Sequence, residues 1–440
     1  MPKPILAIVG RPNVGKSTLF NKIAGSRISI VDDTPGITRD RIYASAEWLN
    51  RPFTVIDTGG LDPDSGDFIT KNIFRQAEAA VEAADVILFL VDMKSGVMDA
   101  DKDIADFLRK SKKPILLVIN KVDSFTKPNN EMYEFYELGL GEPHPISAGQ
   151  SLGLGDMLDE VFKLFHYKEE DEEEDEYIRV AVVGKPNVGK SSLINKILGE
   201  DRVIVSEIPG TTRDAVDTYF EKDGRKYIII DTAGLRRKSR IKENIERYGI
   251  VRSIAAIERA EVCVLIIDAE EGITEQDVKI AGIAHERGKA AIIAINKWDK
   301  IEKDNKTTRE YEKQIDVDLS YMPYAPKIFI SALTGQRIPK LFAHIYTAYQ
   351  NNHLRISTGV LNDVIIEATA SHQPPTDKGR MLRIYYSTQV SVKPPTFVFF
   401  VNDKKLMHYS YKRYLENKLR VAFGFSGTPM HFIVRNKDEK

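Results

Sequence analysis

The sequence predicts an α/β protein with two successive domains, each containing a mostly parallel, doubly wound sheet, followed by a small α+β domain. A glycine-rich loop occurs twice, at residues 10–17 and 184–191, so that its two lysines are 174 residues apart. After each loop, short apolar runs alternate with amphipathic stretches, as in parallel sheets covered by helices on both faces. The likeness between the halves ends near Asn352, so a different domain is predicted to follow.

Each half begins with an apolar strand, the loop and a helix. The predicted strands are Ile5–Val9 and 180–183, the helices are 17–24 and 191–198, and Gly25 and Gly199 stand where helix C-caps are expected. Later apolar runs correspond in pairs, 53–56 with 227–230, 86–91 with 262–267, and 114–119 with 290–295. The amphipathic stretches 69–83 and 245–260 are predicted helices between these strands.

The composition is that of an ordinary globular protein. The chain has 440 residues, 42% hydrophobic and 29% charged, with a formal net charge of −1, so no global charge indicates a nucleic-acid or membrane partner. The single cysteine, Cys263, lies in an apolar run and is expected in the core. No apolar run approaches the ~20 residues of a membrane span. These features predict a cytoplasmic protein with no membrane partner.

An acidic segment separates the halves. Residues 169–176 are all Asp or Glu, and such a run repels itself and favours a flexible, extended linker. Contact with a basic partner surface is the alternative. The predicted domains are residues 1–167, a linker at 168–176, a second domain at 177–352 and a third at 353–440.

The third domain is predicted to be small, mixed and basic. Its expected elements are a helix at 360–370, strands at 381–390 and Thr396–Val401, a helix at 410–422 and a strand at 430–434. From residue 354 onward there are 14 Lys and Arg against 7 Asp and Glu, an excess that favours RNA binding. The aromatic residues on its strands are expected in the core more than in base stacking. They are Tyr385, Tyr386, Phe397, Phe399 and Phe400.

The repeated loop fits the pattern G-x-x-x-x-G-K-[ST] of a P-loop, whose backbone N–H groups and lysine bind phosphates at a helix N-terminus. By itself the pattern also occurs in ATPases. The first predicted phosphate site contains Gly10, Asn13, Val14, Gly15, Lys16, Ser17 and Thr18. The second contains Gly184, Asn187, Val188, Gly189, Lys190, Ser191 and Ser192.

A second motif predicts guanine as the base. N-K-x-D follows the fourth apolar run of each half, and its carboxylate can accept two hydrogen bonds from the guanine edge, whereas adenine would leave it unpaired. The loop after the next strand could add backbone donors. The guanine residues are Asn120, Lys121, Asp123, Ser147 and Ala148 in the first half, and Asn296, Lys297, Asp299, Ser331 and Ala332 in the second.

Two further elements are expected to sense the γ-phosphate. Asp57 and Gly60, like Asp231 and Gly234, belong to Asp-x-x-Gly motifs that follow a strand. The segments 35–40 and 209–214 align at the same spacing, which selects Thr38 and Thr212 as switch threonines, although either alone could be a turn hydroxyl. The predicted Mg²⁺ ligands are Ser17, Thr38, Asp57, Ser191, Thr212 and Asp231.

This doubled set of motifs, with the acidic linker and the basic C-terminal domain, resembles the EngA/Der family of bacterial GTPases. The resemblance covers nearly the whole chain. It implies two P-loop GTPase domains, a KH-like C-terminal domain, and GTP, GDP and Mg²⁺ as ligands. It also implies a monomer that assists late assembly of the large ribosomal subunit, with rRNA and ribosomal proteins as partners.

Three features qualify what the resemblance implies. Leu61 and Leu235 stand where many GTPases have a Gln that orients water, so slow intrinsic hydrolysis is expected. Asn13 and Asn187 resemble the asparagines of potassium-activated GTPases, which implies K⁺ as a further cofactor. The only G-x-x-G of the third domain, residues 424–427, lies between a helix and the last strand; it is expected to be a turn rather than an RNA clamp.

The sequence gives less support to two other functional classes. A GTPase partner in RNA modification is the alternative, although no cofactor motif stands outside the nucleotide sites. A membrane-remodelling GTPase would need an amphipathic basic helix or a lipidation signal, which the sequence lacks. The basic residues 236–240 are a candidate contact surface or a solvated switch loop.

Overall fold

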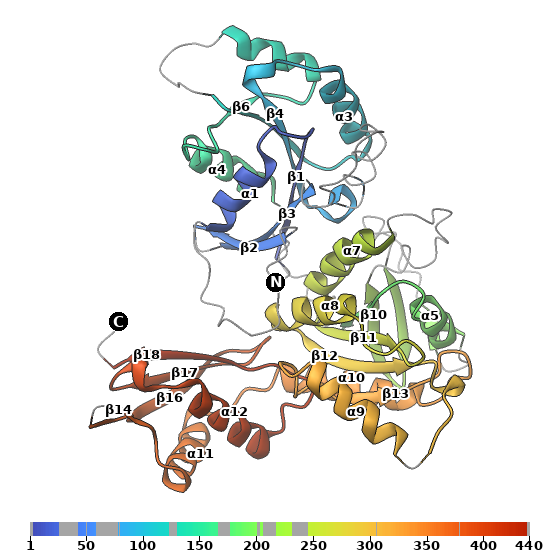
Figure 1. Cartoon of the computed structure of the whole chain (residues 1–440), viewed down its shortest axis with the longest axis vertical. Helices are drawn as coiled ribbons and strands as arrows, with labels where there is room; N and C mark the ends of the chain where they lie inside the picture. The colour runs from blue at the N-terminus through green and yellow to red at the C-terminus, as the bar shows by residue number, and fades with distance from the viewer. Residues whose placement is uncertain are drawn as a thin grey trace. The chain divides into compact units, whose positions relative to one another are not determined.

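The computed structural model describes residues 3–25, 43–49, 51–58, 78, 80–122, 130–165, 177–199, 203–205, 217–230, 245–304, 306–377 and 379–437. The chain forms two compact units (Figure 1). The first contains Met1–Glu174 and Ile241–Glu258, and the second contains Asp175–Arg240 and Arg259–Lys440. The linker and residues 236–240 lie outside the described residues, so the domain boundaries above stay predictions.

The first unit contains a sheet of six strands in the order β2-β3-β1-β4-β5-β6. All neighbouring strands are parallel except β2, which runs antiparallel to β3 at the edge. The strands are β1 (Ile5–Val9), β2 (Tyr43–Trp48), β3 (Arg51–Asp57), β4 (Val86–Asp92), β5 (Ile115–Asn120) and β6 (His144–Pro145). The predicted apolar strands are therefore confirmed.

Helices cover both faces of this sheet (Figure 1). One face packs against α1 and α4, and the other packs against α3. The helical elements are α1 (Lys16–Gly25), η2 (Met93–Ser95), α3 (Asp99–Lys110), η3 (Asn130–Leu138) and α4 (Leu154–Leu164). Of the predicted helix at 69–83, residues 78 and 80–83 are described and helical.

The first unit also includes most of helix α7 (Ile245–Arg259). Val251 belongs to the same core cluster as the strand residue Phe89. The buried Glu258 carboxylate accepts a hydrogen bond of 2.7 Å from the Thr54 hydroxyl. This contact satisfies a carboxylate that would otherwise be costly to bury.

The second unit has a sheet in the order β13-β12-β11-β7-β10-β9-β8. Its strands are β7 (Tyr177–Val183), β8 (Val203–Val205), β9 (Thr218–Lys222), β10 (Arg225–Ile230), β11 (Val262–Asp268), β12 (Ala290–Asn296) and β13 (Lys327–Phe329). The helical elements are α5 (Lys190–Leu198), α8 (Glu275–Glu286), η5 (Trp298–Lys300), α9 (Thr307–Asp318) and α10 (Ile338–Asn352). Gly199 is the C-cap of α5, as predicted. Cys263 is buried on β11, which confirms its core position.

The C-terminal part of this unit is a three-stranded sheet with two helices on one face. The elements are α11 (Thr358–Ser371), β14 (Thr376–Asp377), β15 (Arg380–Met381), β16 (Ile384–Ser391), β17 (Thr396–Val401), η6 (Lys404–Leu406), α12 (Tyr409–Phe423) and β18 (His431–Asn436). β16 and β17 are antiparallel, whereas β17 and β18 are parallel. Phe397 and Phe399 lie in the core with Leu415. Tyr385 and Tyr386, in contrast, are about half exposed, and Phe400 is only half-buried, so the expectation that the strand aromatics lie in the core is wrong for these three.

The G-x-x-G segment is a turn, as predicted, and it joins the C-terminal part to the second α/β sheet. The Gly427 N–H donates to the Tyr324 carbonyl, and the Gly427 carbonyl accepts from the Ala291 N–H, both at 2.8 Å. A Cβ on Gly427 would lie 2.5 Å from the Ala348 Cβ. The close approach of the two backbones therefore requires glycine at this position.

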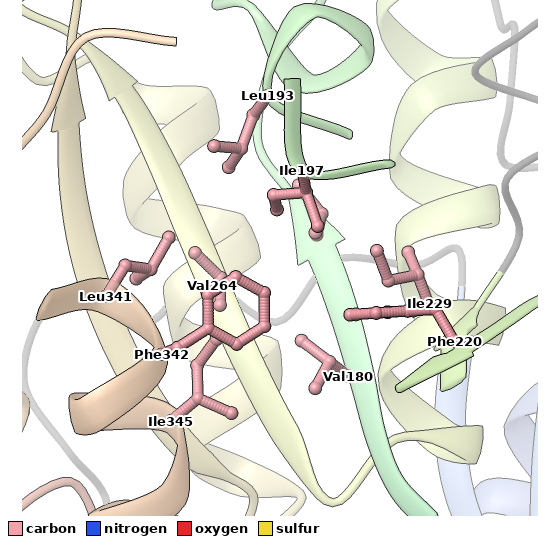
Figure 2. A pocket seen from close by; sticks show the side chains of 10 residues that line it. Val180, Leu193, Ile197, Phe220, Ile229, Val264, Leu341, Phe342 and Ile345 are labelled. Carbon is pink, nitrogen blue, oxygen red and sulfur yellow. The ribbon is translucent and has the colours of Figure 1, made fainter. Parts of the chain in front are cut away.

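A small apolar cavity lies within the second sheet domain, between β7, β10 and helix α10 (Figure 2). Its volume is about 10 Å³, and its lining includes Val180, Val264, Phe220 and Phe342. That volume is about the minimum for one water, which would find no polar partner there. The cavity is a packing defect rather than a ligand site.

Candidate nucleotide-binding sites

The first P-loop connects β1 to α1 and passes close to two other strands. A Cβ on Gly10 would lie 2.3 Å from the Leu90 carbonyl oxygen on β4. Gly15 has φ +99°, and its Cβ would lie 2.3 Å from the Asn120 amide nitrogen. Both glycines are thus required by close approach, and Gly15 also by its backbone conformation.

Asn120, at the end of β5, holds the P-loop against the loop that follows β6. Its Nδ2 donates to the Val14 carbonyl at 2.8 Å, and its Oδ1 accepts from the Ala148 N–H at 2.9 Å. The side chain is buried, so each of these bonds satisfies a group that water cannot reach. The first residue of N-K-x-D therefore connects the three loops.

The second half repeats this arrangement. Asn296 Nδ2 donates to the Val188 carbonyl at 2.8 Å, and its Oδ1 accepts from the Ala332 N–H at 2.9 Å. A Cβ on Gly189 would lie 2.2 Å from the Asn296 amide nitrogen. The two halves agree in these distances to within 0.1 Å.

The lysine of each N-K-x-D motif pairs with an aspartate that the sequence reasoning missed. Lys121 Nζ lies 2.7 Å from Asp92 Oδ2 and also donates to the Asn13 carbonyl at 2.8 Å. Lys297 forms the same ion pair with Asp268. Each aspartate ends the apolar strand beside the motif, with Asp92 opposite Asn120 and Asp268 opposite Asn296. Their position at the strand end was the signal that could have found them.

The P-loop lysines donate hydrogen bonds to backbone carbonyls. Lys16 Nζ donates to the Arg11 carbonyl at 2.8 Å. Lys190 Nζ donates to the Gly184 and Lys185 carbonyls at 2.8 and 2.6 Å. Burial lowers the pKa of Lys16 to about 8, against the opposing charge of Asp57, and burial likewise lowers the pKa of Lys190 to about 8. These partly desolvated ammonium groups have carbonyl partners that an anion can replace.

One predicted Mg²⁺ ligand pair lies together in the first half. The Ser17 hydroxyl donates to Asp57 Oδ2 at 2.8 Å, at the start of α1 and the end of β3. A hydroxyl and a buried carboxylate are oxygen donors of the kind that Mg²⁺ accepts. Ser191 occupies the corresponding place at the start of α5.

The loops after β6 and β13 have the expected place beside the base-recognition motif. Ser147 and Leu152 exchange backbone hydrogen bonds of 3.0 and 3.1 Å, which close the first loop. In the second half, a hydrogen bond from Ser331 lowers the pKa of Asp299. This hydrogen bond favours the charged form of the Asp299 carboxylate, the form that can accept hydrogen bonds.

Six predicted site residues lie outside the described residues. They are Thr38, Gly60 and Asp123 in the first half, and Thr212, Asp231 and Gly234 in the second. Leu61 and Leu235 are also outside. The switch assignments therefore stay predictions, as do the roles of the other predicted site residues.

Two family comparisons cover most of the chain. Residues 5–121 and 179–297 match the family described as "50S ribosome-binding GTPase". Residues 355–435 match the "KH-domain-like of EngA bacterial GTPase enzymes, C-terminal". The chain is 62% identical to a "GTPase Der" of Agathobacter rectalis over 439 residues, which cover 100% of both chains. It is 60% identical to a "GTPase Der" of Clostridium perfringens, again over 100% of both.

The chain belongs to the GTPase Der (EngA) family. The resemblance inferred from the motifs is thereby confirmed, as is the predicted fold of two P-loop GTPase domains and a KH-like domain. Members of the Der family hydrolyse GTP, and the enzyme class of this chain is GTPase. Among the described residues, no helix is long and apolar enough to cross a bilayer.

Proposed function

We propose that this Der-family GTPase binds one GTP in each half and acts in late assembly of the large ribosomal subunit. The observation that carries the proposal is the repeated link from asparagine to the P-loop, formed by Asn120 in one half and Asn296 in the other. Two sites of matching geometry support two functional nucleotides. The family description as 50S ribosome-binding supports the partner.

Within each site the residues have separate roles. The P-loop residues and lysines bind the phosphates, and Asp123 and Asp299 accept from guanine. Ser17, Thr38 and Asp57 would hold Mg²⁺ in the first site, and Ser191, Thr212 and Asp231 would hold it in the second. When bound, Mg²⁺ would supply positive charge to the phosphates. Water attacks the γ-phosphate, and GDP and phosphate leave.

Potassium is proposed as a further cofactor at both sites. Asn13 and Asn187 have φ values of 65° and 64°, so both P-loops turn in the same left-handed conformation at this residue. Their side chains are proposed to bind K⁺ beside the transferring phosphate, where positive charge replaces an arginine finger. Faster hydrolysis in KCl than in NaCl at one ionic strength is expected. Equal rates would contradict this assignment.

The ribosomal role is tested by sedimentation with purified large subunits. The full-length chain is mixed with the subunits in a non-hydrolysable GTP analogue, in GDP, or without nucleotide. We expect the chain to sediment with the subunits in the analogue and less in GDP, because nucleotide sets the population of the binding shape. The variant Lys16→Ala/Lys190→Ala should sediment with the subunits to the same extent in the GTP analogue and in GDP. Binding that ignores nucleotide, or association with vesicles alone, would overturn the proposal.

A further inference from the structure

The second residue of the P-loop differs between the sites: it is Arg11 in the first and Lys185 in the second. Arg11 pairs with a residue at the start of α3, and Lys185 pairs with a residue just before α8. Arg11 Nε lies 3.2 and 3.1 Å from the two carboxylate oxygens of Asp101, and its Nη2 donates to the Ser95 hydroxyl. Asp101 is in the first turn of α3 and is fully buried. The P-loop is thus attached by an ion pair to a helix ninety residues away in sequence.

Asp101 also accepts a hydrogen bond from the backbone at the start of its helix. Its Oδ2 accepts from the Met98 N–H at 3.1 Å, which completes the start of the helix. Burial raises the pKa of Asp101, and both this backbone bond and the charge of Arg11 oppose the rise. At the other end, the Arg11 carbonyl accepts from Lys16 Nζ. A single residue therefore connects the start of α3 to the phosphate-binding lysine.

In the second half this connection uses different contacts. The Lys185 ammonium pairs with Glu271, whose side chain is 60% exposed. The residue that corresponds to Asp101 is Asp277, in the first turn of α8 and fully buried. Its Oδ2 accepts from Thr274, and burial raises the pKa of Asp277 against the opposing effect of the Lys185 backbone and ammonium charge, but no side chain donates to its Oδ1 among the described residues. Lysine has one terminal nitrogen, and Lys185 uses it on the more exposed carboxylate.

We propose that Arg11 and Asp101 are positioning residues that hold the first P-loop in its phosphate-binding shape, and that Lys185 provides only a weaker form of this hold in the second. The inference rests on the proposed nucleotide sites and adds a determinant of their relative affinity. A mobile P-loop is competent for only part of the time, and apparent affinity falls in proportion to the competent fraction. A Lys–Glu pair whose carboxylate is exposed restrains the loop less than a two-oxygen Arg–Asp pair whose carboxylate is buried.

The test measures GDP affinity by calorimetry on the full-length chain with one site silenced. With Lys190→Ala in place, Arg11→Lys and Asp101→Asn should each weaken binding at the first site by roughly tenfold, the effect expected for losing one charged hydrogen bond. At saturating GTP the turnover number should change little while KM rises, because a positioning residue alters binding of substrate and transition state alike. Arg109→Lys, on the exposed face of α3, is the matched control and should have no effect.

The decisive variant is expected to gain GDP affinity rather than lose it. With Lys16→Ala silencing the first site, Lys185→Arg should tighten GDP binding at the second site several-fold, because the forked guanidinium can pair with both carboxylate oxygens of Asp277, as Arg11 pairs with Asp101. The gain should disappear in Lys185→Arg/Asp277→Asn. If residue 185 had a structural role alone, Lys185→Arg would not tighten GDP binding.

Unchanged affinity in both Arg11→Lys and Lys185→Arg would overturn the inference. If Lys16→Ala/Lys190→Ala still binds GDP, the assignment of the two nucleotide sites is wrong. Failure to bind ribosomal subunits would leave this test valid, because it measures nucleotide alone.

Discussion

Asn120 and Asn296 use all of their polar atoms inside the protein. Each amide joins a P-loop carbonyl on one side and the N–H of the next base-recognition loop on the other. At the residue scale, therefore, the phosphate and base regions of a site are one hydrogen-bonded assembly. Cooperative networks of this kind depend on every member.

Asn120→Asp tests this assembly with little change of shape. The donor to the Val14 carbonyl is replaced by an acceptor, so two oxygens face each other in a buried place. We expect GDP affinity at the first site to fall by roughly ten- to a hundredfold, because the cost is that of a lost buried bond. Calorimetry with the second site silenced by Lys190→Ala measures the loss. Asn296→Asp, the matched control, should leave the first site unaffected.

At the scale of elements, the buried strands were predictable and the edge strands were less so. β4 and β11 are apolar on both faces and fully buried, a pattern that identifies interior parallel strands. β2 (Tyr43–Trp48) was not predicted from the sequence, because an edge strand of mixed polar and apolar residues resembles a loop. β9, which lies between β10 and β8, was missed because its buried residues alternate with half-buried ones and form no apolar run.

The nucleotide sites also contain residues that the sequence predicts and residues that it does not. Short-range motifs identified the P-loops and N-K-x-D segments, since their spacing is fixed by local backbone geometry. Asp92 and Asp268 could have been found from their position at a strand end, beside the N-K-x-D strand. Asp101 could not be chosen from the many acidic residues, because its contact with Arg11 depends on how helix α3 packs near the P-loop.

The turn at Gly427 gives a prediction for the joint between β12, α10 and the C-terminal part. Gly427→Ala would place a Cβ 2.5 Å from the Ala348 Cβ, at a φ of +76°. We expect a loss of about 2–4 kcal/mol in the free energy of unfolding, from backbone strain and overpacking together. Gly424→Ala is the control, because its φ is +89° but nothing lies within 4 Å of the added Cβ. Urea unfolding that gives equal losses for both would contradict the packing argument.

At the scale of the whole molecule, polar and charged contacts within the second unit hold the second GTPase domain and the KH-like domain together. Glu261, just before β11, lies 3.1 Å from Lys393 Nζ and 3.3 Å from His353 Nε2. Burial would raise the pKa of Glu261, but His353, Lys393 and Arg179 lower it to about 2. The carboxylate therefore stays charged throughout the physiological range, and this contact persists.

His285 makes the stability of the second unit depend on pH. Burial, with the charges of His431 and Arg420, lowers its pKa to about 4, and its Nδ1 lies 2.9 Å from the Tyr324 hydroxyl. Between the ordinary pKa of 6.5 and about 4, the unfolded chain binds the proton and the folded chain does not. The unfolded state is therefore favoured as the pH falls through this window.

We expect the free energy of unfolding to decrease by up to about 3 kcal/mol across that window because of His285 alone. His285→Gln should reduce this pH dependence, whereas His408→Gln, at an exposed position, should keep it. Chemical unfolding at pH 7.5 and pH 5 compares the three proteins. An unchanged difference between the two pH values in His285→Gln would show that another group is responsible.

The most direct test of the two-site account is calorimetric titration of the full-length chain with GDP and with ADP. The account predicts two GDP molecules per chain, one in each of Lys16→Ala and Lys190→Ala, none in the double variant, and no measurable ADP binding. A single GDP per unmodified chain, or a preference for ADP, would contradict it.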